Sequence, residues 1–209
     1  GTAMRFLVGY FSSKQNSEVI LTGSERMQQR PIGVLVEALR DLGADISYVE
    51  NEGYPPVRIK GKAITKDKVQ INGNVSSQYI SSLILMGTHL AKGVTIELMG
   101  EITSIPYIKM TLSLLNQLGI STYFEGNTIQ VLPAKQLQKQ TVVVESDWSS
   151  ASYFYSICAL SDPGTEITLS AYKKESLQGD SVLANIYTSF GVETTYGQNT
   201  ITLKKTAGF

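Results

Sequence analysis

The chain has 209 residues with 18 basic and 18 acidic side chains, and its formal net charge of 0 argues against a general nucleic-acid binder, which usually carries a basic excess. Charged residues make up 17% and hydrophobic residues 42%, which excludes a disordered tail and a coiled coil, and no apolar run approaches the roughly 18 residues of a membrane span. One cysteine, Cys158, and one histidine, His89, exclude an internal disulfide and a His/Cys zinc site. We therefore expect a cytoplasmic globular protein of one or two domains that uses no metal.

The first part of the chain predicts a helix, a strand, a second helix and a β-hairpin. Gly1-Thr2 leads directly into the first helix, without an initiator methionine or a signal-peptide pattern, which is typical of a segment from the middle of a longer chain. The second helix has apolar residues at helical spacing and ends before Gly43, which suits the left-handed C′ position. The predicted elements are a helix over 3–11, a strand over 19–21, a helix over 32–42 and a hairpin of strands 44–48 and 57–59.

The same order of elements recurs twice more, each time with an additional strand in front. The second copy has strands 69–71, 94–98, 120–122 and 129–131, with helices 78–90 and 108–118, the latter ending before Gly119. The third copy has strands 142–144, 167–169, 192–194 and 201–203, with helices 151–160 and 182–190, the latter ending before Gly191. The repeating unit is therefore βαβαββ, roughly 70 residues long, present as two full repeats and one that lacks its first strand. The predicted fold class is α/β (α+β).

Two features follow from this repeat. Two segments could serve as linkers, residues 61–68 and 133–141. The second is the better candidate for a boundary, because it opens with proline, is rich in Lys and Gln, and ends where a run of valines begins. We therefore expect one domain over residues 1–136 and another over 137–209. The missing strand of the first repeat leaves an exposed sheet edge, which predicts self-association between chains.

Polar residues gather where the predicted helices begin. They are Gly1-Thr2, Ser76-Ser77-Gln78, Ser104 with Tyr107, and Asp147 to Ser150, while Arg30 stands just before another helix. Free N–H groups and the positive end of the helix dipole suit phosphate or carboxylate at such ends, and a guanidinium forks onto either anion. Two alternatives stay open at this point: the serines are ordinary N-caps, and Arg30 is a solvated surface charge.

Six segments, taken in order, resemble the 5-enolpyruvylshikimate-3-phosphate synthase (3-phosphoshikimate 1-carboxyvinyltransferase) family, an enolpyruvyl-transferase fold. They are Gly1-Thr2-Ala3-Met4-Arg5, residues 26–32, Ser76-Ser77-Gln78, Pro106-Tyr107-Ile108, residues 147–154, and Gln178-Gly179-Asp180. The resemblance implies two globular domains built from six copies of the repeat. Residues 1–136 would belong to the substrate-binding domain and residues 137–209 to the opposite one.

The resemblance also implies an activity and its site residues. The family transfers the enolpyruvyl group of phosphoenolpyruvate to the 5-hydroxyl of shikimate 3-phosphate, with these two small molecules as its partners and without a cofactor, a nucleic acid or a membrane. The parent protein would be monomeric and would act in the synthesis of aromatic amino acids, and glyphosate would compete in its phosphoenolpyruvate pocket. Matched positions for shikimate 3-phosphate are Ser76, Ser77, Gln78, Ser104 and Tyr107; those for phosphoenolpyruvate are Gly1, Thr2, Arg5, Arg30 and Gln78.

The resemblance leaves the catalytic groups unmatched. The family's catalytic Asp and Glu have no counterpart in these 209 residues, and Asp147 is matched only to a position that faces the active-site cleft. We therefore expect a central fragment of the enzyme that does not turn over alone. Two alternatives stay open: an enzyme similar to UDP-N-acetylglucosamine 1-carboxyvinyltransferase, and a non-catalytic binding module. The first of these uses a catalytic cysteine in a loop, which Cys158 on its apolar helix does not resemble.

Overall fold

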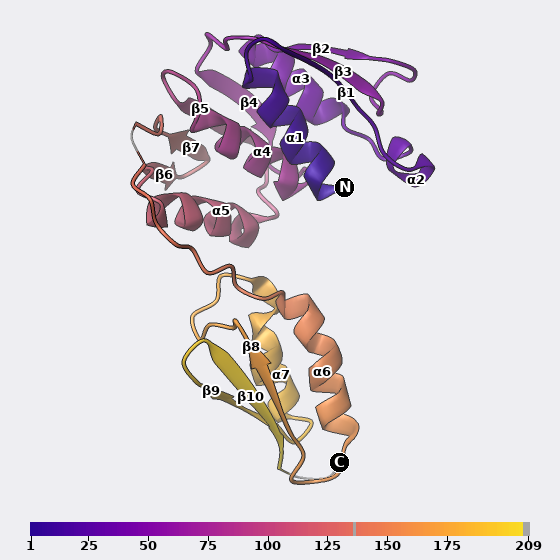
Figure 1. Ribbon diagram of the computed structural model, residues 1–209, viewed down its shortest axis with the longest axis vertical. Helices are drawn as coiled ribbons and strands as arrows, with labels where there is room; N and C mark the ends of the chain where they lie inside the picture. Colours follow the sequence, from indigo (N-terminus) through magenta and orange to yellow (C-terminus); the bar gives the residue numbers. More distant parts are fainter. Residues whose placement is uncertain (136, 207–209) are drawn as a thin grey trace. The chain divides into compact units, whose positions relative to one another are not determined.

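The protein forms two compact units, Gly1–Gln138 and Lys139–Phe209, and each is described by itself (Figure 1). The computed structural model describes residues 1–135 and 137–206. Each unit has its own hydrophobic core: Leu39, Leu83 and Ile96 are fully buried in the first, and Trp148 and Tyr155 are fully buried in the second. Among the described residues, none belongs to both cores, so each unit is held together by its own buried side chains.

The first repeat is a helical pair packed on a three-stranded sheet. The strand order is β1-β3-β2, with β3 antiparallel to both neighbours, so β1 and β2 are the edges. Buried Leu35, Leu39 and Leu42 recur at helical spacing and turn one face of α3 into the core. The elements are α1 (Thr2–Ser13), β1 (Ser17–Leu21), a short α2 (Glu25–Gln28), α3 (Gly33–Leu42), β2 (Asp45–Tyr48) and β3 (Val57–Gly61).

The second repeat has the complete βαβαββ order. Its sheet order is β4-β5-β7-β6, with β4 parallel to β5 and the other pairs antiparallel. A parallel pair needs a crossover, and α4 supplies it. Because α4 lies between the sheet and its helical neighbours, eight of its residues, Tyr79 to Gly87 with the exception of Leu85, are buried. The elements are β4 (Lys68–Asn72), α4 (Ser77–Gly87), β5 (Val94–Met99), α5 (Ile105–Gln117), β6 (Thr122–Glu125) and β7 (Thr128–Val131).

The third repeat forms the second unit. Its sheet order is β8-β10-β9, and both pairs are antiparallel. Ile201 and Leu203 alternate along β10 and are fully buried, as the period of a half-buried strand requires. The elements are α6 (Trp148–Leu160), β8 (Glu166–Ser170), the 3-10 helix η1 (Gly179–Val182), α7 (Leu183–Thr188), β9 (Val192–Tyr196) and β10 (Thr200–Lys205).

The three glycines that follow the second helix of each repeat have the left-handed backbone that their positions predict. The φ angles are 106° at Gly43, 83° at Gly119 and 71° at Gly191. A residue with a Cβ is strained there, so glycine lets the chain leave the helix and enter the hairpin. The predicted order of helices and hairpins, and the α/β (α+β) class, are confirmed.

One predicted strand is wrong. Residues Val142–Val144 form no strand, and Val144 is 82% exposed. A run of valines favours extended backbone, but a strand forms only where its N–H and C=O groups meet a partner edge. The contact with the end of β8 comes after the valines, where the Ser146 N–H donates to the Ala171 carbonyl at 2.7 Å. Among the described residues only the second repeat is therefore complete, and both β1 and β8 pair on one side only.

The described residues contain no helix with the length and apolar character needed to cross a membrane.

Candidate functional site

The N-terminal ends of α1 and α4 meet through a row of hydrogen bonds. Arg5 Nη1 donates to Ser76 Oγ at 3.3 Å and to Gln78 Oε1 at 2.5 Å. Gln78 Nε2 in turn donates to Thr2 Oγ1 at 2.8 Å. The Ser82 hydroxyl, one turn further along α4, donates to the Arg5 carbonyl at 2.8 Å. Residues more than 70 positions apart in the sequence are thereby joined at one place.

Arg5 is a buried cation at the centre of this row. The residue is 7% exposed, and its guanidinium carbon lies 4.8 Å from the centre of the Tyr79 ring. An aromatic face attracts a cation, which offsets part of the cost of removing the charge from water. Its Nε–H is buried and has no hydrogen-bond partner among the described residues. Arg5 therefore lies buried behind Ser76 and Gln78, and its part in a phosphoenolpyruvate site stays a prediction.

Arg30 reaches the same place from a different segment. A Cβ built on Gly1 would lie 2.5 Å from Arg30 Nη1, so the guanidinium lies directly against Gly1. The Tyr79 hydroxyl donates to the Pro31 carbonyl at 2.7 Å and holds the end of this segment against α4. Arg30 itself is exposed. The structure thus brings an exposed arginine to the beginning of α1, next to Thr2.

The beginning of α5 lies beside the beginning of α4. The Thr103 N–H donates to the Gly73 carbonyl at 3.3 Å, which joins the two loops that precede the helices. The hydroxyls of Ser81 and Thr111 are 2.9 Å apart and join the helices themselves. Ser104, at the N-cap of α5, and Tyr107, which is 49% exposed, therefore lie on the α5 side of this shared end.

The serines at these helix ends do not act as ordinary side-chain caps. Neither Ser76 at the N-cap of α4 nor Ser104 at the N-cap of α5 makes a side-chain capping hydrogen bond within the described residues. An N-cap serine normally accepts from an N–H group of the first turn. The capping interpretation of these serines is therefore not supported, because neither side chain occupies an N–H group of the first turn. At α4 the Tyr79 N–H donates to the Ser76 carbonyl at 2.9 Å.

Asp147 is a structural cap. Its carboxylate accepts from the Ser149 N–H at 2.9 Å and from the Ser150 hydroxyl at 3.0 Å, while Ser149 donates its hydroxyl to Asp180. Glu145 accepts nearby from the Trp148 indole N–H at 3.0 Å. The carboxylates at the beginning of α6 thus use the donors that an anion would need.

Two side chains at this place, Tyr79 and Ser82, are not predicted from the sequence. Tyr79 lies beneath the Arg5 guanidinium and binds the Pro31 carbonyl, and Ser82 binds the Arg5 backbone. In the sequence both belong to an apolar helix, where tyrosine and serine are unremarkable. Only the packing of α1 on α4 gives them these partners, so no local pattern could have found them.

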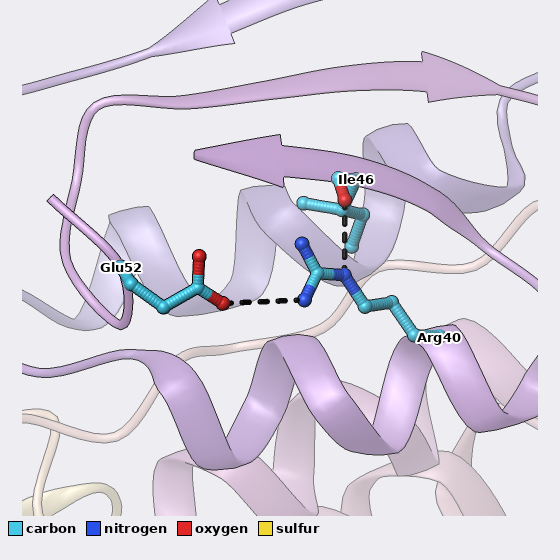
Figure 2. Close-up of polar contacts among 3 residues, drawn as sticks. All are labelled: Arg40, Ile46 and Glu52. Carbon is cyan, nitrogen blue, oxygen red and sulfur yellow. Dashed lines mark hydrogen bonds and ion pairs between the residues drawn. The ribbon is translucent and has the colours of Figure 1, made fainter. Parts of the chain in front are cut away.

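Another arginine of the first unit shows the ordinary use of this side chain. Arg40 of α3 donates through Nε to the Ile46 carbonyl at 3.0 Å and lies 3.6 Å from a carboxylate oxygen of Glu52, in the loop after β2 (Figure 2). Its charge has an acidic partner, whereas no ion pair reaches Arg5 within the described residues. No group of three or more His, Cys, Asp or Glu side chains able to hold a metal occurs in the described part of the chain.

Cys158 takes no part in a site. It is buried in the core of the second unit, and burial raises the pKa of its thiol. A thiol in such surroundings is protonated and unreactive at neutral pH.

A known protein family and curated relatives match almost the whole chain. The family model of EPSP synthase (3-phosphoshikimate 1-carboxyvinyltransferase) matches residues 1–208. The 3-phosphoshikimate 1-carboxyvinyltransferase of Bacteroides fragilis is 50% identical over 206 residues, which are 98% of this chain and 50% of that protein. The protein of the same name from Histophilus somni is 40% identical over 98% of this chain and 48% of its own length.

Solved structures agree on the fold. EPSP synthase from Acinetobacter baumannii superposes with a TM-score of 0.75 at 24% identity, covering 99% of this chain and 46% of that one. The enolpyruvyl transferase NikO from Streptomyces tendae gives 0.61 at 17% identity, covering 96% and 46%. The chain spans about half the length of the curated relatives it matches, and their names do not favour the nucleotide-sugar alternative. The chain belongs to the EPSP synthase (3-phosphoshikimate 1-carboxyvinyltransferase) family.

Proposed function

We propose that this chain is the part of an EPSP synthase that holds shikimate 3-phosphate and one side of the phosphoenolpyruvate site. One observation carries the proposal: a buried arginine joins the beginnings of α1 and α4 at Ser76 and Gln78, two of the positions assigned to substrate. Ser76, Ser77 and Ser104 would bind the phosphate of shikimate 3-phosphate, and Tyr107 would lie near its ring. This follows the match of these positions to the family.

The phosphoenolpyruvate side of the proposal uses the beginning of α1. Arg30 would bind the phosphate or carboxylate of phosphoenolpyruvate beside Gly1 and Thr2, because a guanidinium pairs with either anion through two parallel hydrogen bonds. Gln78 would contact both substrates. The exposed guanidinium against Gly1 supports this assignment.

We further propose that these residues bind the substrates but do not catalyse the transfer. Transfer of the enolpyruvyl group by addition and elimination needs a proton donor for the methylene carbon and a base for the 5-hydroxyl. The residues named at this end are serines, a threonine, a glutamine, tyrosines and arginines, which bind and orient anions but are poor acids and bases at neutral pH. We therefore propose that the 209-residue chain binds its ligands without turnover. We also propose a cytoplasmic location and the two domains, 1–136 and 137–209, that the repeat predicts. Self-association through the free edge of β1 also stays a proposal.

Calorimetric titration of the 209-residue chain with shikimate 3-phosphate tests the binding, and a phosphate-release assay with both substrates tests turnover. We expect saturable binding of shikimate 3-phosphate and no phosphate release above the background. A chain that fails to bind, while circular dichroism shows that it is folded, would contradict the first half of the proposal. Release at the rate of a full-length EPSP synthase would contradict the second.

A further inference from the structure

Arg5 fixes the direction of the hydrogen bonds that link its guanidinium to Ser76, Gln78 and, through Gln78, Thr2. A guanidinium only donates, so the Gln78 atom that faces it at 2.5 Å is the carbonyl oxygen and not the amide nitrogen. The Ser76 oxygen, 3.3 Å away, likewise accepts. Gln78 is left with its NH₂ group, which donates to Thr2 at 2.8 Å. One donor at the start of the row therefore orients three other groups.

The consequence is a change in what the site offers to a ligand. A hydroxyl and an amide each donate and accept, so alone they bind alcohols, cations and anions about equally well. Here the oxygens of Ser76, Gln78 and Thr2 already accept from within the protein. Each oxygen has one lone pair engaged in this way, so the hydroxyl hydrogens of Ser76 and Thr2 and the second amide hydrogen of Gln78 are directed away from these partners. This bias toward donors favours an oxyanion over a cation.

The charge behind these donors acts in the same direction. Arg5 is 7% exposed and has no carboxylate partner among the described residues, unlike Arg40 with Glu52 (Figure 2). Its contact with the Tyr79 ring at 4.8 Å leaves the net positive charge in place. A cation that is partly withdrawn from water attracts an anion more strongly than a solvated one does.

We propose that Arg5 is a specificity-determining residue that acts through Ser76 and Gln78: by drawing their oxygens toward itself it leaves their hydrogens for a ligand at the shared end of α1 and α4, and so selects a phosphorylated ligand over its unphosphorylated parent. Arg5 is therefore a positioning residue and not a ligand of the substrate. The identity of the ligand rests on the proposed function, which makes shikimate 3-phosphate and unphosphorylated shikimate the natural pair to compare.

Calorimetric titration of the 209-residue chain with each of the two compounds measures the selection. For Arg5→Met we expect the affinity ratio between shikimate 3-phosphate and shikimate to fall at least about ten-fold, since hydrogen bonds to charged groups contribute on this scale. Arg5→Lys keeps the charge and a donor and should retain part of the ratio. The control is Arg40→Met, which removes the same charge from the same unit and should leave the ratio unchanged. A ratio that is unchanged in Arg5→Met would overturn the inference.

A second variant keeps the test open if Arg5→Met does not fold. Gln78→Glu retains Arg5 but replaces the NH₂ donor with a carboxylate that pairs with the guanidinium, so the fold should be kept and even stabilised while the preference for the phosphorylated compound is lost. A folded Gln78→Glu chain that keeps the wild-type ratio would also overturn the inference.

A readout without any ligand separates this inference from the proposed function. The side-chain NH₂ of Gln78 should give two well-separated proton signals in NMR spectra, because one hydrogen is bound to Thr2 while Arg5 holds the carbonyl. In Arg5→Met the two signals should move toward each other as the amide becomes free to flip. If the wild-type chain binds neither compound, the proposed function fails, and these signals alone decide: identical signals in both proteins would show that Arg5 does not orient the amide.

Discussion

The helices α4 and α6 occupy the same position in their repeats, yet their N-terminal ends have opposite chemistry. At α4 the N-cap Ser76 makes no capping bond, and a buried arginine stands behind it. At α6 the N-cap Asp147 accepts from the Ser149 N–H, and Ser149 donates its hydroxyl to Asp180. One end presents donors and a positive charge, and the other presents carboxylates that already hold the donors.

The difference shows that the repeat fixes the position of a helix end but not its use. A βαβαββ unit always leaves N–H groups at the beginning of its first helix. Whether they bind an aspartate of the protein or an external anion depends on two or three side chains beside them. Four substitutions at these side chains, or elsewhere in the units that carry them, test this difference, from the largest expected effect to the smallest.

Placing a carboxylate at α4 should make it behave like α6. We expect Ser77→Asp to weaken the binding of shikimate 3-phosphate by about 100-fold or more, because the new charge repels the phosphate and occupies the first-turn N–H groups. The helix itself should be retained, since an acidic first turn favours it. Titration together with far-ultraviolet circular dichroism measures both effects. The matched control is Ser150→Asp at α6, which should leave the affinity unchanged.

The second unit should lose stability at high pH because of Tyr155. Tyr155 is fully buried in the second unit, and burial raises its pKa from 10.0 to about 12. Because the unfolded chain ionises first, this unit should lose stability as the pH rises from 10.0 to about 12. The loss should be roughly 2 to 3 kcal/mol. Below pH 10.0 the contribution of Tyr155 to the stability of the second unit should not change with pH.

Urea unfolding at several pH values, followed by Trp148 fluorescence, measures this loss. Tyr155→Phe has no phenol at this position to ionise and should reduce the decline, while Tyr172 and Tyr196, whose pKa values burial also raises, should keep the remainder. A second unit whose midpoint shows the same alkaline decline with and without Tyr155 would contradict the assignment of this effect to burial.

Removing the cap of α6 should cost stability without affecting binding. Asp147→Ala deletes the acceptor for the Ser149 N–H, and we expect the second unit to lose about 1 kcal/mol. Asp147→Asn keeps a capping oxygen and should lose less. Thermal unfolding gives the stability, and titration with shikimate 3-phosphate should give the wild-type affinity for both variants. A clear loss of affinity in Asp147→Asn would show that this aspartate has a role beyond capping.

The smallest effect is expected at Gly1. A methyl group there would lie 2.5 Å from Arg30 Nη1, which is the far end of a flexible side chain, so the guanidinium should move aside at little cost in stability. Gly1→Ala should weaken the binding of phosphoenolpyruvate a few-fold, because the positive charge leaves its position beside α1. Titration with phosphoenolpyruvate in the presence of saturating shikimate 3-phosphate measures this. An affinity equal to that of wild type would mean that Arg30 does not bind this ligand from its present position.

The sequence predicts the helix ends well because they follow from local chemistry. Periodic apolar residues and a terminal glycine mark α3, α5 and α7, and the order of short motifs predicts that Ser76 to Gln78 form part of a site. The sequence fails at Val142–Val144, because a strand depends on a partner edge that a run of valines does not reveal.

The burial of Arg5 is also beyond sequence reasoning. It depends on the close approach of α1 and α4, where a Cβ on Gly9 would lie 2.5 Å from the Ser82 hydroxyl. In the sequence, a glycine within a helix marks only a position of low helix propensity. The packing that turns Arg5 from a surface charge into a buried support joins residues more than 70 positions apart, and no local signal encodes such a contact.

Mapping of shikimate 3-phosphate on the backbone amides of the 209-residue chain by heteronuclear NMR tests the central claim most directly. The account predicts that the largest shifts occur at the beginnings of α4, α1 and α5, including Ser77, Gln78 and Thr2, and that the amides at the beginning of α6 stay unchanged. Shifts concentrated at Asp147 to Ser150, or no shifts in a folded chain at millimolar ligand, would contradict it.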